Sequence, residues 1–207
     1  MLHTETVEPH TLSVLKDLLK LPVLKDFSLV GGTALSLLFG HRKSVDLDLF
    51  SNKKFENDTV INGMKKNFGK QLNIRTSTSF GIFGFVDNVK VDWVRHPHPL
   101  IRPTQEHDGI RMFSTEDIMA MKVQAVLQRG RKKDFWDIAE LLNHFTMEDF
   151  IDFHKEKYNT QNLAITVPQA ISYFADAEED EDPVSLKKQT WKTVQQSINR
   201  RVRDYLT

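Results

Sequence analysis

The stretch that decides the fold is SLVGGTALSLLFGHRKSVDLDLF, at residues 28–50. Residues 27–30 predict a short strand that stops abruptly at a glycine pair. Residues 33–39 predict a helix, and Gly40 is a suitable C-terminal stop for that helix. Residues 45–50 alternate apolar and acidic side chains, as a strand with one buried face does. A strand, two glycines, a short helix and an acidic strand therefore follow one another directly.

Asp46 and Asp48 are the chemical centre of this stretch. Residues two apart on a strand point to the same face, so both carboxylates are expected to project together. Two such carboxylates repel and need a cation, and Mg²⁺ suits them because it binds carboxylates together with substrate phosphates. Asp92, on a strand at residues 89–94, adds a third carboxylate, and the three predict a cradle for two Mg²⁺ ions. For an isolated acidic strand, the alternative is a solvated sheet face.

The glycine pair predicts a phosphate site. Gly31 and Gly32 let the backbone approach a phosphate closely, and the helix that follows offers free N–H groups at its positive end. Thr33 adds a hydroxyl. The alternative is a plain tight turn in which Thr33 caps the helix.

The part of the chain up to residue 113 has a mixed α/β pattern. It contains an amphipathic helical pattern at residues 11–20, a weaker one at residues 55–68, and strand patterns between residues 71 and 113. Asp87 and Asn88 separate two of these strands and predict a two-residue hairpin turn, because both residues tolerate positive φ.

Residues 114–207 have an all-helical pattern. Ser114 and Thr146 each precede an aspartate by three residues, which is typical of a capping box. Pro168 predicts the start of a further helix, and residues 184–205 predict the last one. The acidic residues 176–182 are expected to form a solvated loop. We therefore predict an α+β fold with two domains, residues 1–113 and residues 114–207.

Composition limits the function. The 207 residues include 28 basic and 28 acidic side chains, so a polynucleotide partner would have to be held by a local patch. The absence of cysteine excludes disulfides, thiolate catalysis and zinc–sulfur sites. The N-terminal residues do not resemble a signal peptide and no apolar run is long enough for a membrane span, so a cytoplasmic location is expected.

Basic side chains mark a second candidate region. Lys122 and Arg129 are seven residues apart on one predicted helix, and two cations on one stripe suit a polyphosphate, although a solvated helix face would have the same pattern. Arg42 is expected to neutralise the acidic pair or to contact a triphosphate, with a surface salt bridge as the alternative. The densest basic cluster could hold an RNA backbone and consists of Arg129, Arg131, Lys132 and Lys133.

Two other residue groups give weaker patterns. Three histidines in one loop region, without a cysteine or a helical H-E-x-x-H, form only a weak zinc pattern. Four aromatic residues could stack on bases, but their strand periodicity favours the core. The histidines are His96, His98 and His107, and the aromatic residues are Phe80, Phe83, Phe85 and Trp93.

The chain resembles the DNA polymerase β-type nucleotidyltransferase fold. More narrowly, it is similar to the AbiEii/AbiGii family of toxin nucleotidyltransferases, over blocks that run from residue 29 to residue 142. The matching blocks are Gly31-Gly32-Thr33-Ala34-Leu35, His41-Arg42-x-Ser44-x-Asp46-x-Asp48-Leu49-Phe50, Lys122-x-x-Ala125-x-x-x-Arg129 and Lys133-Asp134-x-x-Asp137. The C-terminal third carries no matching motif.

The resemblance implies transfer of a nucleotide from a nucleoside triphosphate (NTP) to an acceptor, which in several members is the 3′ end of tRNA. It also implies a separately encoded antitoxin protein as partner. The implied catalytic residues are Asp46, Asp48, Lys122 and Asp134, and the implied substrate-binding residues are Gly31, Gly32, Thr33, Arg42, Ser44, Arg129, Lys133 and Asp137. Asp92 fits the broader fold pattern as a third metal ligand beside Asp46 and Asp48.

Three hypotheses remain open from the sequence. The first is an enzyme acting on RNA, as the toxin of a toxin–antitoxin pair. The second is an enzyme of the same fold that modifies a small molecule such as an antibiotic. The third is a catalytically silent interaction module, which would have no electrostatic reason to keep close, uncompensated carboxylates.

Overall fold

The computed structural model describes residues 1–207 and contains one seven-stranded mixed sheet with the strand order β3-β4-β5-β2-β1-β7-β6. Strand β1 runs antiparallel to β2 and parallel to β7, whereas β2 runs parallel to β5. Strands β3, β4 and β5 are joined antiparallel, as are β6 and β7. The strands are β1 (Ser28–Val30), β2 (Leu47–Ser51), β3 (Leu72–Thr78), β4 (Gly81–Val86), β5 (Val89–Arg95), β6 (Gln105–His107) and β7 (Ile110–Met112).

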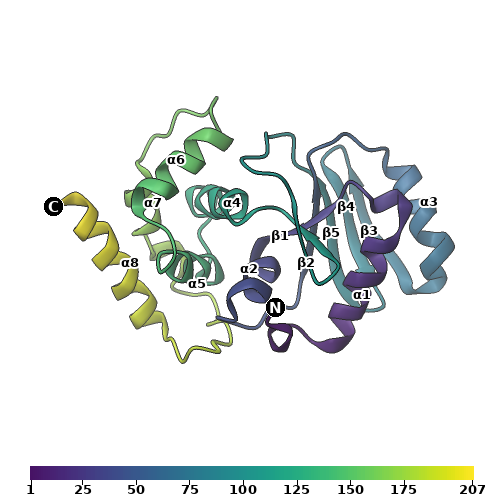
Figure 1. Cartoon of the computed structure of the whole chain (residues 1–207), viewed down its shortest axis with the longest axis horizontal. Coiled ribbons are helices and arrows are strands. Elements are labelled where there is room, and N and C mark those ends of the chain that lie inside the picture. Colours follow the sequence, from purple (N-terminus) through teal and green to yellow (C-terminus); the bar gives the residue numbers. More distant parts are fainter.

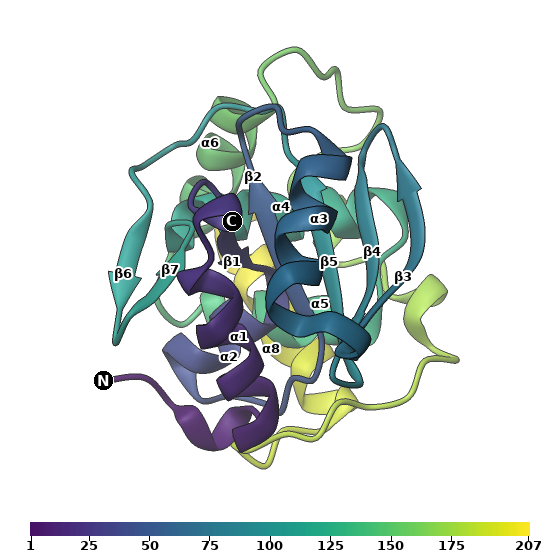
Figure 2. The same cartoon turned by 90° about the vertical axis from the view of Figure 1, so that its right-hand side faces the viewer.

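Helices cover both faces of the sheet. Figures 1 and 2 show α1 and α3 on one outer face, and α2 with the C-terminal helices on the opposite side. The helices are α1 (Pro9–Lys20), α2 (Gly31–Phe39), α3 (Asn57–Phe68), α4 (Thr115–Gln128), α5 (Lys132–Leu141), α6 (Met147–Lys157), α7 (Val167–Ile171) and α8 (Trp191–Leu206). The predicted α+β architecture is confirmed, with a mixed sheet followed by a helical C-terminal half.

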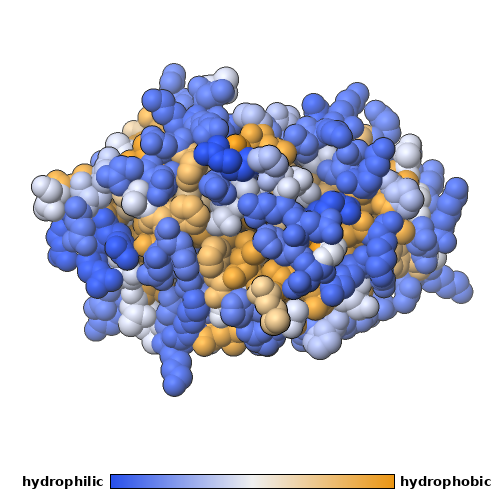
Figure 3. All heavy atoms as spheres, viewed as in Figure 1, coloured by the Kyte–Doolittle hydropathy of each residue, from blue (hydrophilic) through white to orange (hydrophobic).

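The core is continuous across the two halves. A single cluster of 43 buried apolar residues includes Leu29 and Trp93 from the sheet together with Trp136 and Ile198 from the C-terminal helices. On the face shown in Figure 3, apolar residues gather in the middle of the molecule and hydrophilic residues cover both ends. The domain boundary at residue 113 stays a prediction.

The local signals of the sequence correspond closely to the structure. Asp87 and Asn88 form the β4–β5 turn with φ angles of 46° and 66°, as predicted. Gly40 ends α2 in the left-handed conformation, and Ser114 accepts a hydrogen bond from the Asp117 backbone N–H at the start of α4. Short-range hydrogen bonding fixes these positions, which is why a local pattern predicts them.

The prediction for the last helix was wrong at its start. Helix α8 begins at Trp191 after the cap Thr190, not at residue 184. Ser185 instead forms an isolated antiparallel bridge with Arg42, and the Leu186 N–H donates to the His41 carbonyl at 2.9 Å. Backbone pairing with a distant segment therefore replaces the first turns of the predicted helix.

Two further predictions need correction. The acidic residues 176–182 are not simply a solvated loop, because Asp182 contacts Lys132 Nζ at 3.0 Å and Asp180 accepts from the Lys132 N–H at 3.1 Å. Among the aromatic residues, Trp93 is fully buried as predicted, but Phe80 is 73% exposed beside the β3–β4 turn. Phe83 and Phe85 are half-buried, since the core face of β4 is made by Ile82 and Val86.

None of the helices combines the length and the apolar composition that a membrane span requires.

Candidate active site

Strand β2 and the start of α2 bring Gly31 against Asp48. Val30 is the register partner of Asp48, and Gly31 follows with a φ of 71°, a conformation that L side chains rarely adopt. A Cβ on Gly31 would lie 2.7 Å from the Asp48 Oδ2 atom. The absence of a side chain here therefore admits the carboxylate to the N-terminus of α2.

Gly32 serves a different group. A Cβ on Gly32 would lie 2.0 Å from Arg42 Nη2, so this glycine makes room for the guanidinium. Thr33 is buried, and its hydroxyl lies 2.8 Å from the Ser44 hydroxyl and donates to the Asp46 carbonyl. The loop before β2 is thus positioned by Gly32, Thr33 and Ser44. Of the residues predicted to bind phosphate at the glycine pair, only Gly31 lines the cavity described below.

Asp48 and Asp92 are register partners on the parallel strands β2 and β5, so their side chains leave the same face of the sheet. Burial raises the pKa of Asp48 above its ordinary value, and the neighbouring Asp92 and Asp46 raise it further. Burial also raises the pKa of Asp92, against the opposing effect of Lys90. The Oδ1 atom of Asp92 is buried and has no hydrogen-bond partner. This face of the sheet holds more negative charge than the protein itself compensates.

Asp46 lies one residue before β2, and its carboxylate faces a second hollow of about 500 Å³ rather than the cavity that Asp48 lines. Lys133 Nζ lies 3.5 Å from Asp46, and Lys90 Nζ lies 3.7 Å from Asp92. Asp46 precedes the regular strand, yet its charge raises the pKa values of both Asp48 and Asp92, so the three carboxylates lie near one another. The shared metal cradle stays a prediction.

Five side chains form a buried ion cluster, defined as His41, Arg42, Lys122, Asp134 and Asp137. Arg42 donates to Asp137 through Nε at 2.7 Å and through Nη2 at 2.9 Å. Lys122 Nζ lies 2.7 Å from both Asp134 and Asp137, and His41 Nε2 lies 2.7 Å from Asp137. Two cations are thus matched by two carboxylates away from water.

The cluster is electrostatically satisfied. Burial opposes charge on Asp137, yet Arg42 and Lys122 hold the pKa of this carboxyl well below its ordinary value. Burial likewise opposes charge on Lys122, but Asp134 and Asp137 raise the pKa of its ammonium group. The predicted surface salt bridge of Arg42 is wrong, because its partner Asp137 is fully buried. The neighbour His41 was missed as a site residue, although it stands beside Arg42 in the matching block.

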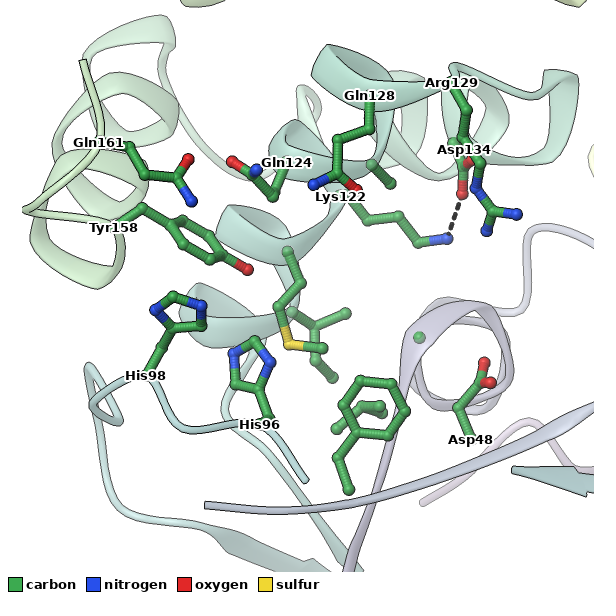
Figure 4. A pocket seen from close by; sticks show the side chains of 16 residues that line it. Asp48, His96, His98, Lys122, Gln124, Gln128, Arg129, Asp134, Tyr158 and Gln161 are labelled. Carbon is green, nitrogen blue, oxygen red and sulfur yellow. Dashed lines mark hydrogen bonds and ion pairs between the residues drawn. The ribbon is translucent and has the colours of Figure 1, made fainter. Parts of the chain in front are cut away.

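A cavity of about 430 Å³ lies between the sheet and α4. We call the residues Gly31, Asp48, Lys122, Arg129 and Asp134 its charged end. Figure 4 shows Lys122 and Asp134 paired opposite Asp48, with Arg129 beside them. Polyphosphate binding needs cations and free N–H groups around an open space, and this end of the cavity offers both.

The predicted basic cluster is only partly free. Lys132 is 8% exposed and pairs with the acidic segment, while Lys133 faces Asp46. Arg129 and Arg131 make no ion pair within the protein, and of these Arg129 lines the cavity. Successive residues at the start of α5 point in different directions, so adjacent basic side chains have separate environments.

Hard carboxylate oxygens suit a divalent cation, and the partnerless Oδ1 of Asp92 beside Asp48 is an atom that such an ion would satisfy. No three histidine or acidic side chains converge as a ready-made ligand set. Mg²⁺ needs only one or two carboxylates when substrate phosphates and waters complete its shell. The residues therefore fit a metal that arrives with a nucleotide.

A glycine turn at a helix start, paired strand carboxylates and a cationic cavity define the site of a nucleotidyltransferase, and solved structures share this fold. MenT4, a nucleotidyltransferase toxin of Mycobacterium tuberculosis H37Rv, aligns with a TM-score of 0.62 and 12% identity over 92% of this chain and 80% of its own. JHP933 from Helicobacter pylori aligns with a TM-score of 0.56 and 18% identity over 95% of this chain and 92% of its own.

Comparison of the sequence with known protein families identifies the family of the chain. The family described as "Nucleotidyl transferase AbiEii toxin, Type IV TA system" matches residues 13–205. The chain belongs to this AbiEii nucleotidyltransferase toxin family, as the resemblance indicated. An uncharacterized protein of Aquifex aeolicus (strain VF5) is 32% identical over 202 residues, which cover 93% of this chain and 94% of that protein. The match includes the C-terminal third, in which the sequence showed no motif.

Proposed function

We propose that this nucleotidyltransferase uses Mg²⁺ to transfer a nucleotide from an NTP to an RNA acceptor, and that the acceptor is tRNA. The observation that carries the proposal is the pair of adjacent strand carboxylates, Asp48 and Asp92, whose pKa values stay raised although Lys90 lies 3.7 Å from Asp92. Asp48 lines the charged end of the cavity beside Gly31. Such carboxylates destabilise the fold unless a ligand neutralises them, which points to a binding role.

In the proposed reaction the acceptor hydroxyl attacks the α-phosphorus of the NTP and pyrophosphate leaves. Mg²⁺ bound by Asp48 and Asp92, with Asp46 close by, would supply charge stabilisation for the attacking and leaving oxygens. Arg129 and the free N–H groups at the start of α2 hold the phosphates, and Lys122 contributes its positive charge from the cavity wall. The proton that the acceptor hydroxyl loses passes to water.

The side chains next to Asp92 support a polynucleotide acceptor. Phe83 is the register partner of Asp92 on β4, is half-buried, and lies on the carboxylate face of the sheet. A partly exposed ring beside these carboxylates suits stacking of an unpaired terminal base. Membership of a toxin family supports an antitoxin protein as partner, and an NTP and tRNA as substrates would be consistent with a cytoplasmic location.

A small-molecule acceptor is the second candidate. It is favoured by the pairing of Lys132 and Lys133 with acidic side chains, which leaves fewer free cations for an RNA backbone.

The test is a labelling assay. Wild-type protein, the Asp46→Ala/Asp48→Ala variant and the control Asp152→Ala, an exposed acidic residue of α6, are incubated with Mg²⁺, each α-labelled NTP in turn and total cellular RNA. Label in a discrete tRNA-sized band with wild type and Asp152→Ala, but not with the double variant, is the expected result. Triphosphate binding without label in RNA would favour the small-molecule acceptor. Absence of triphosphate binding would contradict the proposed function.

A further inference from the structure

The cavity has a second end with a different chemistry. We call it the histidine–tyrosine end and define it as Phe50, His96, His98, Gln124 and Tyr158. Figure 4 shows His96, His98 and Tyr158 gathered on the side of the cavity away from Asp48 and Asp134. No carboxylate, ammonium or guanidinium group is among these five residues, so a ligand that spans the cavity meets permanently charged groups at one end only.

Flat rings dominate this end. The ring centroids of His98 and Tyr158 are 4.6 Å apart, those of His96 and His98 4.9 Å, and those of Phe50 and His96 5.9 Å. Aromatic faces and edges at such spacings pack well against another planar ring. The shape of the wall therefore favours a planar ligand.

Most polar atoms at this end lack a side-chain partner within the protein. Gln124 accepts a hydrogen bond at 2.9 Å from His154 Nε2, which orients its amide and leaves the amide nitrogen free as a donor. The rings of His96 and His98 and the Tyr158 hydroxyl make no side-chain hydrogen bond, and the Nε2 atom of His96 is buried as well. The buried Nε2 atom of His96 is costly without a partner, and the other free polar atoms line a cavity in which a ligand with complementary donors and acceptors can pair with them.

These groups are uncharged at neutral pH. Burial, helped by Lys157, lowers the pKa of His96 to about 3 and also lowers that of His98. Burial lowers the pKa of His154 to about 4, so its Nε2 can donate as a neutral imidazole, and burial raises the pKa of Tyr158. Phosphate groups gain nothing from neutral rings, whereas a neutral heterocycle with hydrogen-bonding edges does.

The loop that carries the two histidines is held in place. Buried Asp117 accepts from the Ile101 N–H at 3.0 Å and from Lys157 Nζ at 2.6 Å. Lys157 also donates to the Pro99 carbonyl at 2.9 Å. Because the start of α4 and the end of α6 both anchor this loop, the histidine–tyrosine end is largely preformed.

We infer that the histidine–tyrosine end receives the base of the donor nucleotide, with the ring of His98, the Tyr158 hydroxyl and the Gln124 amide contacting the base while its triphosphate occupies the charged end. The inference rests on the proposed function, because it assigns the base of the same NTP. Asp92 and Phe83 do not line this cavity, so the acceptor approaches from the other side of Asp48.

The test measures how much the base adds to binding. Dissociation constants in Mg²⁺ are determined by calorimetry for the four NTPs and for ribose 5′-triphosphate, which lacks a base. Wild type is compared with His98→Phe, Tyr158→Phe and Gln124→Met, which keep the size of each side chain and remove its polar group. We expect each variant to lose about 5-fold in affinity for the preferred NTP, since one hydrogen bond contributes about 1 kcal/mol. Affinity for ribose 5′-triphosphate should not change.

Two matched controls exist. His107→Phe alters a histidine that pairs with Gln105 outside the cavity, and Tyr173→Phe alters an exposed tyrosine. Both should bind all probes as wild type does. The inference is overturned if the three cavity variants keep the wild-type advantage of NTPs over ribose 5′-triphosphate.

Two further outcomes are distinguishable. Unchanged NTP affinity, together with altered preference among RNA acceptors that differ only in the 3′-terminal base, would overturn the donor assignment and give this end to the acceptor base. Wild-type protein that binds neither NTP nor ribose 5′-triphosphate would contradict the nucleotidyl-transfer proposal itself.

Discussion

Two groups of aspartates lie near one cavity, and their pKa values are shifted in opposite directions. In the buried ion cluster, Asp137 has a lowered pKa because Arg42 and Lys122 contact it directly. On the sheet, Asp48 has a raised pKa because it is buried beside other carboxylates. The same side chain is satisfied by the protein in one place and left for a ligand in the other. Charge compensation therefore separates the part of the site that supports the fold from the part that we propose binds the metal and nucleotide.

The largest expected effect comes from breaking the buried ion cluster. Asp137→Asn removes the charge that compensates Arg42 and Lys122, and unpaired buried charge of this kind costs ~3–5 kcal/mol. We expect the free energy of unfolding, measured by urea denaturation, to fall by that amount. The control Asp152→Asn, on the exposed face of α6, should leave it unchanged. A variant as stable as wild type would mean that the cluster does not support the fold.

The same type of substitution on the sheet should have the opposite effect and stabilise the protein. Asp48→Asn removes a desolvated charge that Asp92 and Asp46 repel, so the melting temperature at neutral pH should rise. Nucleotide transfer should fall by ~100-fold or more, as expected when an electrostatic contact to the reacting phosphate is lost. Thermal unfolding and the labelling assay, run on one preparation, check both parts. A lower melting temperature would show that Asp48 is compensated after all.

Alanine variants of two separate glycines, Gly31 and Gly69, distinguish the effect of backbone strain from that of the contact with Asp48. Gly31 and Gly69 both have positive φ, at 71° and 52°, but nothing lies within 4 Å of a Cβ placed on Gly69. Alanine at either position should cost ~1–2 kcal/mol of stability, because an L side chain disfavours this conformation. Only Gly31→Ala should also lose activity, since its methyl group would displace the Asp48 carboxylate. Equal activity of the two variants would contradict a role for this close contact.

The smallest expected effect is a change with pH. Asp137 has a lowered pKa, so its contribution to stability is complete above the ordinary aspartate value of 3.8 and is lost as the pH falls towards its folded-state pKa. The difference in unfolding free energy between wild type and Asp137→Asn should therefore shrink below about pH 4. Urea titrations at several pH values measure it. A difference that stayed constant would mean that Asp137 is not charged in the cluster.

The sequence predicted those parts of the site that depend on local geometry. The glycine turn, the strand that carries Asp48, the β4–β5 hairpin and the caps of α4 and α6 all follow from neighbouring residues. The sequence did not predict the pairing of residues that are far apart along the chain. Nothing near Arg42 indicates a partner 95 residues away, and nothing near residue 185 indicates a bridge to Arg42. For the same reason the sequence suggested that Lys122 and Lys133 were free, because the acids that pair with them come from other elements.

The long separation within the ion cluster has a consequence for synthesis of the protein. Asp46 and Asp48 leave the ribosome well before Lys122, Asp134 and Asp137, and the segment that bridges Arg42 follows later still. A nascent or truncated chain that stops before α5 has a lone Arg42 and half of a nucleotide cavity. The complete cavity can therefore form only late in translation, so we expect fragments released early to lack nucleotidyltransferase activity.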